Sequence, residues 1–129
     1  MKKIVLFVFN ILFMSYLCAA QEDVLTSLKS HLKAGDAKLV ATYFNELVEI
    51  NINGEKGSYS KTQAEFVLKD FFRKNPPLDY KKIHQGASKE GLNYTIGNYT
   101  CAEGSYRVYI VVKLFKGNYL IDTIDFSKE

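Results

Sequence analysis

Asp122 and His84 are the two ionisable side chains whose positions in predicted strands are suited to acid–base chemistry. Asp122 lies in the run YLIDTIDF, where strict alternation places it on the same face as Leu120, Ile124 and Phe126. A carboxyl group on an apolar face has a raised pKa and can act as a general base. The alternative is an aspartate at the solvated end of the domain, or one bonded to a neighbouring tyrosine.

His84 is the second candidate general base, on a predicted strand where Tyr80 and Lys82 have the same parity. The alternative is a half-buried histidine that forms a hydrogen bond at the edge of the sheet. The sequence contains no Gly-rich phosphate loop and no G-x-S-x-G, H-E-x-x-H or C-x-x-C motif. Two histidines, His31 and His84, are too few to predict a zinc site. No metal and no cofactor are therefore predicted.

Aromatic side chains are the candidates for a ligand pocket, because a tyrosine offers a rigid ring with a polar tip. The sequence contains nine tyrosines. The predicted pocket residues, together with Asp122, are Tyr43, Tyr59, Phe71, Tyr94 and Tyr106. The alternative is that these rings complete the hydrophobic core and reach water with their hydroxyl groups.

Three predicted helices must help to position these residues. Val24, Leu25, Leu28 and Leu32 recur at helical spacing, which predicts a first helix over residues 22–34 that ends at a glycine. Asp36 is placed to cap a short second helix. The predicted apolar face of that helix consists of Leu39, Val40, Tyr43 and Phe44.

The third predicted helix begins with a capping-box pattern, Ser60 followed by Gln63. It continues to about Lys74 and ends before a Pro-Pro pair, because proline cannot continue a helix. Its predicted apolar stripe consists of Ala64, Val67, Leu68, Phe71 and Phe72. We interpret this stripe as the part of the helix that covers a sheet, and the charged side chains between these residues as a solvated face.

The other segments have a period of two and predict strands. Val48, Ile50 and Ile52 share one face of the first strand, which turn residues 53–58 connect to a short strand ending at Tyr59. The connections between the later strands are short and contain glycine, which indicates antiparallel hairpins. These strands are predicted at residues 78–88, 92–101, 105–115 and 119–126. Helices followed by a long antiparallel sheet indicate an α+β fold.

The first 20 residues are typical of a cleaved signal peptide, with two lysines, an apolar run and a cut after Ala20. The apolar run is shorter than the roughly 20 residues that a membrane span needs. We therefore expect residues 21–129 to be exported as one domain without a stable membrane anchor.

The charge of this mature chain is nearly balanced. Two of the 17 basic residues lie in the leader, which leaves 15 against 14 acidic ones and no basic surface for nucleic acid. Cys101 is the one cysteine after cleavage, so no internal disulfide is expected. We interpret Cys101 as a buried strand residue, with a reactive thiol or a dimer link as the alternatives.

Four stretches of the sequence, GSYSKTQAEFVLKDFF, KNPP, IHQGAS and SYRVYIVVK, carry a family resemblance. With the order of the elements, they resemble the nuclear transport factor 2-like, cystatin-like fold, and more narrowly the small secreted Bacteroidetes proteins of unknown function within it. The resemblance implies a cone-shaped, curved antiparallel sheet packed on three helices. The superfamily includes isomerases, dehydratases, ligand-binding domains and protein-interaction domains, so the fold selects no function.

The sequence and the resemblance together favour a periplasmic or extracellular binding domain without catalytic activity. It would bind a small apolar ligand inside the cone, or a protein partner on the outer face of the sheet. A homodimer through that outer face is a further alternative. The apolar residues predicted there are Tyr99, Tyr109, Val111 and Phe115. The competing hypothesis is a proton-transfer enzyme of isomerase or dehydratase type, with Asp122 or His84 as the general base.

Overall fold

The structure, a computed structural model, describes residues 25–87 and 92–129, so the predicted signal peptide lies outside the described residues. Residues 25–34 are helical. The elements that follow are α2 (Ala37–Ala41), β1 (Phe44–Ile52), β2 (Glu55–Ser60), α3 (Lys61–Lys74), β3 (Pro77–Ala87), β4 (Leu92–Cys101), β5 (Gly104–Phe115) and β6 (Asn118–Lys128). No helix in the described ranges is long and apolar enough to cross a membrane.

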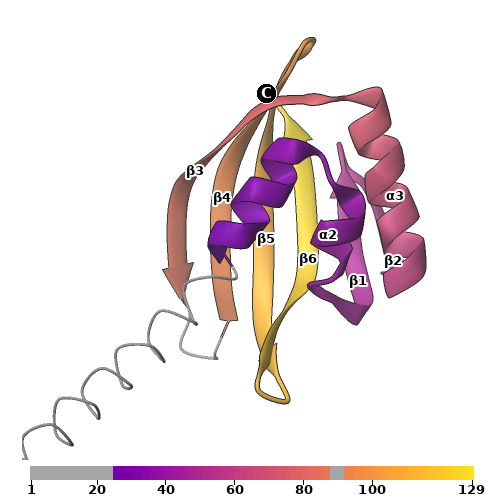
Figure 1. Ribbon diagram of the computed structural model, residues 1–129, viewed down its shortest axis with the longest axis vertical. Coiled ribbons are helices and arrows are strands. Elements are labelled where there is room, and N and C mark those ends of the chain that lie inside the picture. Colours follow the sequence, from indigo (N-terminus) through magenta and orange to yellow (C-terminus); the bar gives the residue numbers. More distant parts are fainter. Residues whose placement is uncertain (1–24, 88–91) are drawn as a thin grey trace, which may run out of the picture.

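The strands form one six-stranded sheet in the order β2-β1-β6-β5-β4-β3, and the helices pack on one side of it (Figure 1). We call the helix-covered side the inner face and the opposite side the outer face. The buried side chains of the helices and of the inner face form one hydrophobic core. The predicted α+β fold, with a curved sheet packed on helices, is confirmed.

The turn after the first helix follows the sequence, whereas α2 is shorter than predicted. Gly35 has a φ of +66°, a left-handed conformation that suits a helix end. The Asp36 carboxylate accepts a hydrogen bond from the backbone N–H of Leu39 at 3.1 Å and so caps α2. Phe44, predicted on the helix, is buried in β1, because that strand already begins there and pairs with Ile121 of β6.

Helix α3 begins and ends as its sequence predicts. The Ser60 hydroxyl accepts a hydrogen bond from the Gln63 backbone, and the Gln63 side chain accepts one from the Ser60 backbone, both at 3.3 Å. At the other end, the Asn75 N–H donates to the Phe71 carbonyl at 2.9 Å. Four residues of the predicted stripe are buried, namely Ala64, Leu68, Phe71 and Phe72. The fifth, Val67, is partly buried against the core.

The β1–β2 hairpin has a tighter turn than predicted. Asn53 and Gly54 have φ values of 53° and 89°, as a two-residue type I′ turn requires. Residues 55–58, predicted as turn, therefore belong to β2.

One strand pair departs from the predicted antiparallel arrangement, because β1 runs parallel to β6 and the sheet is mixed. A parallel pair requires a long crossover connection, and here α3 and the intervening strands lie within it. The other pairs, including all three among β3 to β6, are antiparallel as predicted.

Phe71 lies at the centre of an aromatic cluster in the core. Its ring centroid is 4.2 Å from that of Phe126, 5.2 Å from that of Tyr106 and 5.6 Å from that of Tyr99. The hydroxyl of Tyr99 donates a hydrogen bond to the carbonyl oxygen of Asn75, just beyond α3. The cluster therefore joins α3 to β4, β5 and β6.

Replacing Phe71 with alanine should lower the free energy of unfolding by about 3–5 kcal/mol. The substitution leaves a cavity that the surrounding packed rings cannot fill completely. Phe66→Ala is the matched control on the same helix. The Phe66 side chain is 62% exposed, whereas that of Phe71 is 3% exposed, so the control should change stability by about 0.5 kcal/mol or less. Urea denaturation followed by circular dichroism measures both changes. Equal losses in the two variants would contradict the central role of Phe71.

Candidate functional site

A β-bulge in β6 moves Asp122 away from the apolar face. Val111 of β5 pairs with Thr123, but the next residue, Val112, pairs with Ile121, so Asp122 is the extra residue. The bulge interrupts strict alternation, and the buried residues of β6 are Ile121, Ile124 and Phe126. The predicted position of Asp122 on the apolar face is therefore wrong.

Asp122 instead lies on the outer face beside Lys113 of β5. One carboxylate oxygen is 3.4 Å from the Lys113 ammonium nitrogen, and both side chains are partly accessible to water. The Thr123 hydroxyl is also 3.4 Å from that oxygen. The general-base hypothesis for Asp122 depended on burial beside apolar side chains, which this position does not provide.

A second bulge, in β3, has the same effect on His84. Lys82 pairs with Gly97 and His84 pairs with Ile96, so Ile83 is the extra residue. His84 therefore does not share a face with Lys82, although their sequence spacing predicts that it does. The imidazole is exposed on the outer face, at the edge of the sheet.

His84, Tyr94 and Tyr109 form a row of rings across the outer faces of β3, β4 and β5. The ring centroids of His84 and Tyr94 are 5.8 Å apart, as are those of Tyr94 and Tyr109. The Nε2 atom of His84 is 3.3 Å from the Tyr94 hydroxyl oxygen. Ile96 and Val111 pair with these tyrosines and share the same face. We call these five residues the outer aromatic patch.

The predicted outer-face residues are only partly correct. Tyr109 is 39% exposed, Val111 is partly exposed, and Phe115 is also exposed. Tyr99 was predicted with them, but it pairs with Tyr106 and both rings are buried on the inner face. This assignment of Tyr99 is wrong, because the β4–β5 register gives Tyr99 the parity of the core residues.

The six predicted pocket residues do not gather in one place. Phe71 and Tyr106 fill the space between α3 and the sheet. Tyr43 and Tyr59 are partly buried against the core. The other two, Tyr94 and Asp122, lie on the outer face.

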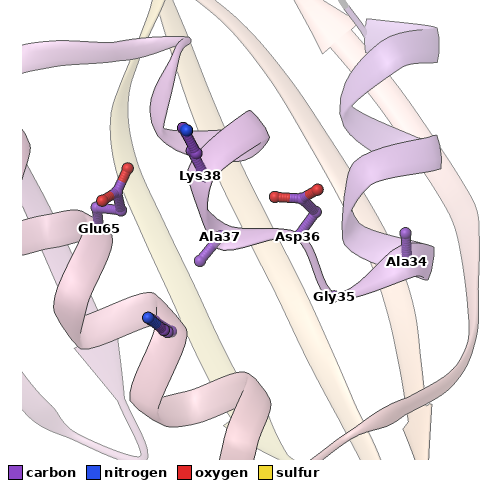
Figure 2. Close-up of a pocket in the computed structure, with 7 residues that line it drawn as sticks. Ala34, Gly35, Asp36, Ala37, Lys38 and Glu65 are labelled. Carbon is purple, nitrogen blue, oxygen red and sulfur yellow. The ribbon is translucent and has the colours of Figure 1, made fainter.

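An open depression of about 380 Å³ lies where the turn before α2 approaches α3 (Figure 2). It is lined by Ala34, Gly35, Asp36, Ala37, Lys38, Glu65 and Lys69. None of the predicted pocket residues borders it. Its lining combines two lysines with two carboxylates and has no aromatic ring, so it offers no clear selectivity for one class of ligand.

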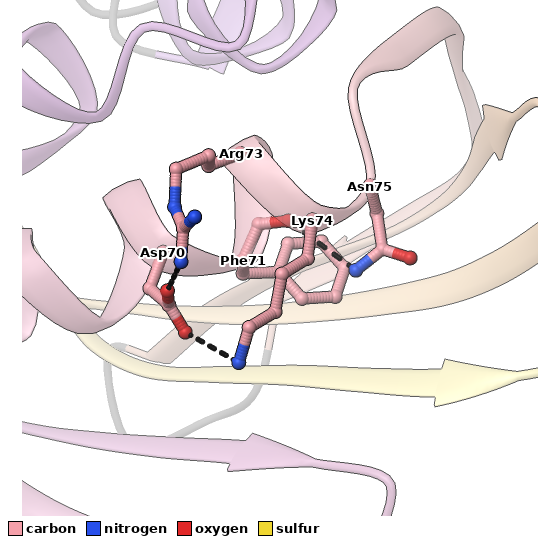
Figure 3. Close-up of polar contacts among 5 residues, drawn as sticks. All are labelled: Asp70, Phe71, Arg73, Lys74 and Asn75. Atoms are coloured by element: carbon pink, nitrogen blue, oxygen red, sulfur yellow. Dashed lines mark hydrogen bonds and ion pairs between the residues drawn. The ribbon is translucent and has the colours of Figure 1, made fainter.

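The last turn of α3 carries an exposed charge network (Figure 3). Hydrogen bonds from Arg73 at 2.7 Å and Lys74 at 2.9 Å hold the pKa of Asp70 below its usual value. A carboxylate with a lowered pKa is a weaker base, which agrees with the predicted solvated role of this helix face. In residues 25–87 and 92–129, no group of three or more His, Cys, Asp or Glu side chains is arranged to hold a metal.

Sequence reasoning missed Ile96 and the alignment of His84 with Tyr94. For β6, the sequence does contain one signal of the bulge. Ile121 and Ile124 are three residues apart, and this break in the period of two is typical of a bulge. For β3, the run YKKIHQ has no such signal, because the extra residue, Ile83, is itself exposed.

The order of the elements and the helix-covered curved sheet define a small α+β domain of the nuclear transport factor 2-like class. The NTF-2 like protein of unknown function from Silicibacter pomeroyi is similar to it, with a TM-score of 0.61 and 13% identity over 90% of this chain and 98% of that one. Within this class, a family model described as a domain of unknown function, DUF4783, matches residues 25–127. The chain belongs to the DUF4783 family.

Solved structures of two DUF4783 proteins agree with this assignment. The protein from Bacteroides ovatus ATCC 8483 has a TM-score of 0.76 at 24% identity, covering 80% of this chain and 93% of that one. The protein from Bacteroides fragilis YCH46 has a TM-score of 0.75 at 26% identity, covering 80% of this chain and 96% of that one. No protein of curated function matches the sequence. The resemblance to a Bacteroidetes family of unknown function is thus confirmed.

Two buried tyrosines have raised pKa values. Burial raises the pKa of Tyr80 to about 12, and burial also raises the pKa of Tyr99. Both phenols therefore stay protonated at physiological pH. They can donate hydrogen bonds, as Tyr99 does to Asn75, but they do not supply a base.

Tyr80→Phe should reduce the loss of stability at alkaline pH. In the folded protein the pKa of Tyr80, about 12, lies above the ordinary value of 10.0. The contribution of Tyr80 to the free energy of unfolding is therefore present below pH 10 and is lost between about pH 10 and 12. Removing the phenol should reduce that loss by about 2 kcal/mol. Urea unfolding at pH 8, 10 and 11.5 measures the change, with the exposed Tyr109→Phe as control. An equally steep decline in the Tyr80→Phe variant and the parent would contradict it.

Proposed function

We propose that the mature chain is an exported, non-catalytic domain that binds a protein partner through the outer aromatic patch. The row formed by His84, Tyr94 and Tyr109 is the observation that carries this proposal. Protein interfaces are enriched in tyrosine, whose large ring and polar tip suit a partly wet surface. On the described chain this row lies on the sheet face opposite the helices.

The packing of the inner face supports the choice of the outer face as the binding surface. Phe71, Tyr99 and Tyr106 pack together between α3 and the sheet and occupy the space in which a small apolar ligand would lie. The part of the inner face beneath α3 is thus filled by core side chains, whereas the outer face is available for recognition. We therefore favour a protein partner over a small ligand inside the cone.

The surroundings of the patch resemble the rim of a protein interface. Charged side chains on neighbouring positions form ion pairs, Lys113 with Asp122 at 3.4 Å and Arg107 with Glu129 at 3.1 Å. An apolar, aromatic centre with a charged rim is the usual anatomy of such an interface. Because the predicted leader directs export, the partner would be met in the periplasm or outside the cell.

A photo-crosslinking amino acid in place of Tyr109 should give a discrete covalent adduct when the protein is expressed with its leader in a Bacteroides host. The same amino acid in place of Phe66 is the matched control, because Phe66 is exposed on α3, away from the patch. Adducts are detected as bands of increased mass after irradiation, and their composition is read by mass spectrometry. An adduct of twice the protomer mass identifies a second copy as the partner.

The proposal predicts an adduct from position 109 and none from position 66. No adduct from position 109, or the same set of bands from both positions, would overturn it.

A further inference from the structure

Strand β3 forms one end of the sheet, and β4 is its one strand neighbour in the described chain. It is 11 residues long, whereas β2 at the other end has six. An edge strand presents backbone N–H and C=O groups that can pair with another chain. Two apolar side chains of β3, Leu78 and Ile83, are also 66% and 59% exposed. Register shifts at Leu78 and Ile83 divide this edge into shorter regular segments, and both residues present apolar side chains of the kind that strand addition uses.

Two adjacent lysines lie at the middle of this edge. Lys81 pairs with Asn98 and Lys82 pairs with Gly97, so the two ammonium groups extend from opposite faces of the sheet. Neither lysine forms an ion pair within the described residues, and Lys82 donates a hydrogen bond to the neutral Gln85 side chain at 3.0 Å. A strand added beside β3 would meet positive charge on both of its faces.

The same lysines disfavour a second copy of this chain at the edge. Lys82 is the middle residue of Pro77–Ala87, so a two-fold antiparallel pairing over the full length of β3 would bring the lysines of both copies together. Like charges directly opposite each other destabilise a strand pair. Lysines on an edge strand thus protect against self-association, but they attract a strand of opposite charge.

We propose that the β3 edge accepts an extended, acidic segment of a partner protein as a seventh strand, with carboxylates beside Lys81 and Lys82. This inference rests on the proposed function, in which the partner is a protein. His84 connects the two surfaces, because it lies on β3 and belongs to the outer aromatic patch. A side chain of the added strand next to His84 would extend that patch.

Two ten-residue peptides of alternating threonine and valine test the inference, one with two adjacent glutamates at its centre and one with two lysines there. NMR titration of the isotope-labelled mature protein measures their binding. The glutamate peptide should shift the backbone amide signals of β3, slow their hydrogen exchange, and bind at least about tenfold more tightly than the lysine peptide at low salt. The difference should decrease as salt rises, because exposed charges are screened.

Charge reversal by Lys81→Glu with Lys82→Glu should invert the preference between the peptides. The control is Lys61→Glu with Lys69→Glu, which makes the same change of net charge on exposed positions of α3 and should leave the preference as in the parent. No shift of β3 amides at about 1 mM glutamate peptide, equal binding of the two peptides, or dimerisation through β3 in sedimentation would each overturn the inference.

The peptide titration and the crosslinking experiment can fail independently of each other. An adduct at position 109 without peptide binding at β3 overturns the edge inference and leaves the outer aromatic patch supported. Peptide binding at β3 without an adduct at position 109 overturns the role of the patch and supports the edge.

Discussion

The Phe71 ring extends from α3 into the sheet and meets the Phe126 ring with 4.2 Å between the centroids. Around this contact, Tyr99 and Tyr106 close the inner face, and Asn75 accepts a hydrogen bond from the Tyr99 hydroxyl where α3 ends. The arrangement fixes the position of α3 over the sheet and makes the inner face a packed core. Tight packing of this kind gives these rings a structural role in the core.

The features predicted best from the sequence are those determined by nearby residues. The capping box of Ser60 and Gln63 and the helix end at Gly35 each depend on a few neighbouring positions. The stripe of α3 follows from a regular period of 3.6 residues, and its prediction holds because no irregularity interrupts the helix. Such local rules were sufficient to predict the fold class and most of the helix and strand boundaries.

The candidate site depended instead on non-local strand register. The parity of Asp122 and His84 was counted along single strands, and one extra residue in β6 and in β3 moved each side chain to the opposite face. The parallel pairing of β1 with β6 is equally non-local, since it joins segments separated by most of the domain. A sequence pattern records which residues are apolar, but bulges arise from how two strands match, which neither strand determines alone.

The parallel β1–β6 pair also explains why the two ends of the sheet differ. Because β1 lies beside β6, its hairpin partner β2 becomes one end of the sheet, and the connection through α3 leads to β3 at the other end. The β2 end is short and contacts α3, whereas β3 is 11 residues long, one fewer than β5, the longest strand, and pairs with β4. The crossover that builds the core therefore leaves one long strand with a single strand neighbour in the described chain, and the bulge in β3 places His84 on the outer face beside that edge. Edge and patch adjoin as a consequence of topology, which is why a partner that extends the sheet would also reach the aromatic row.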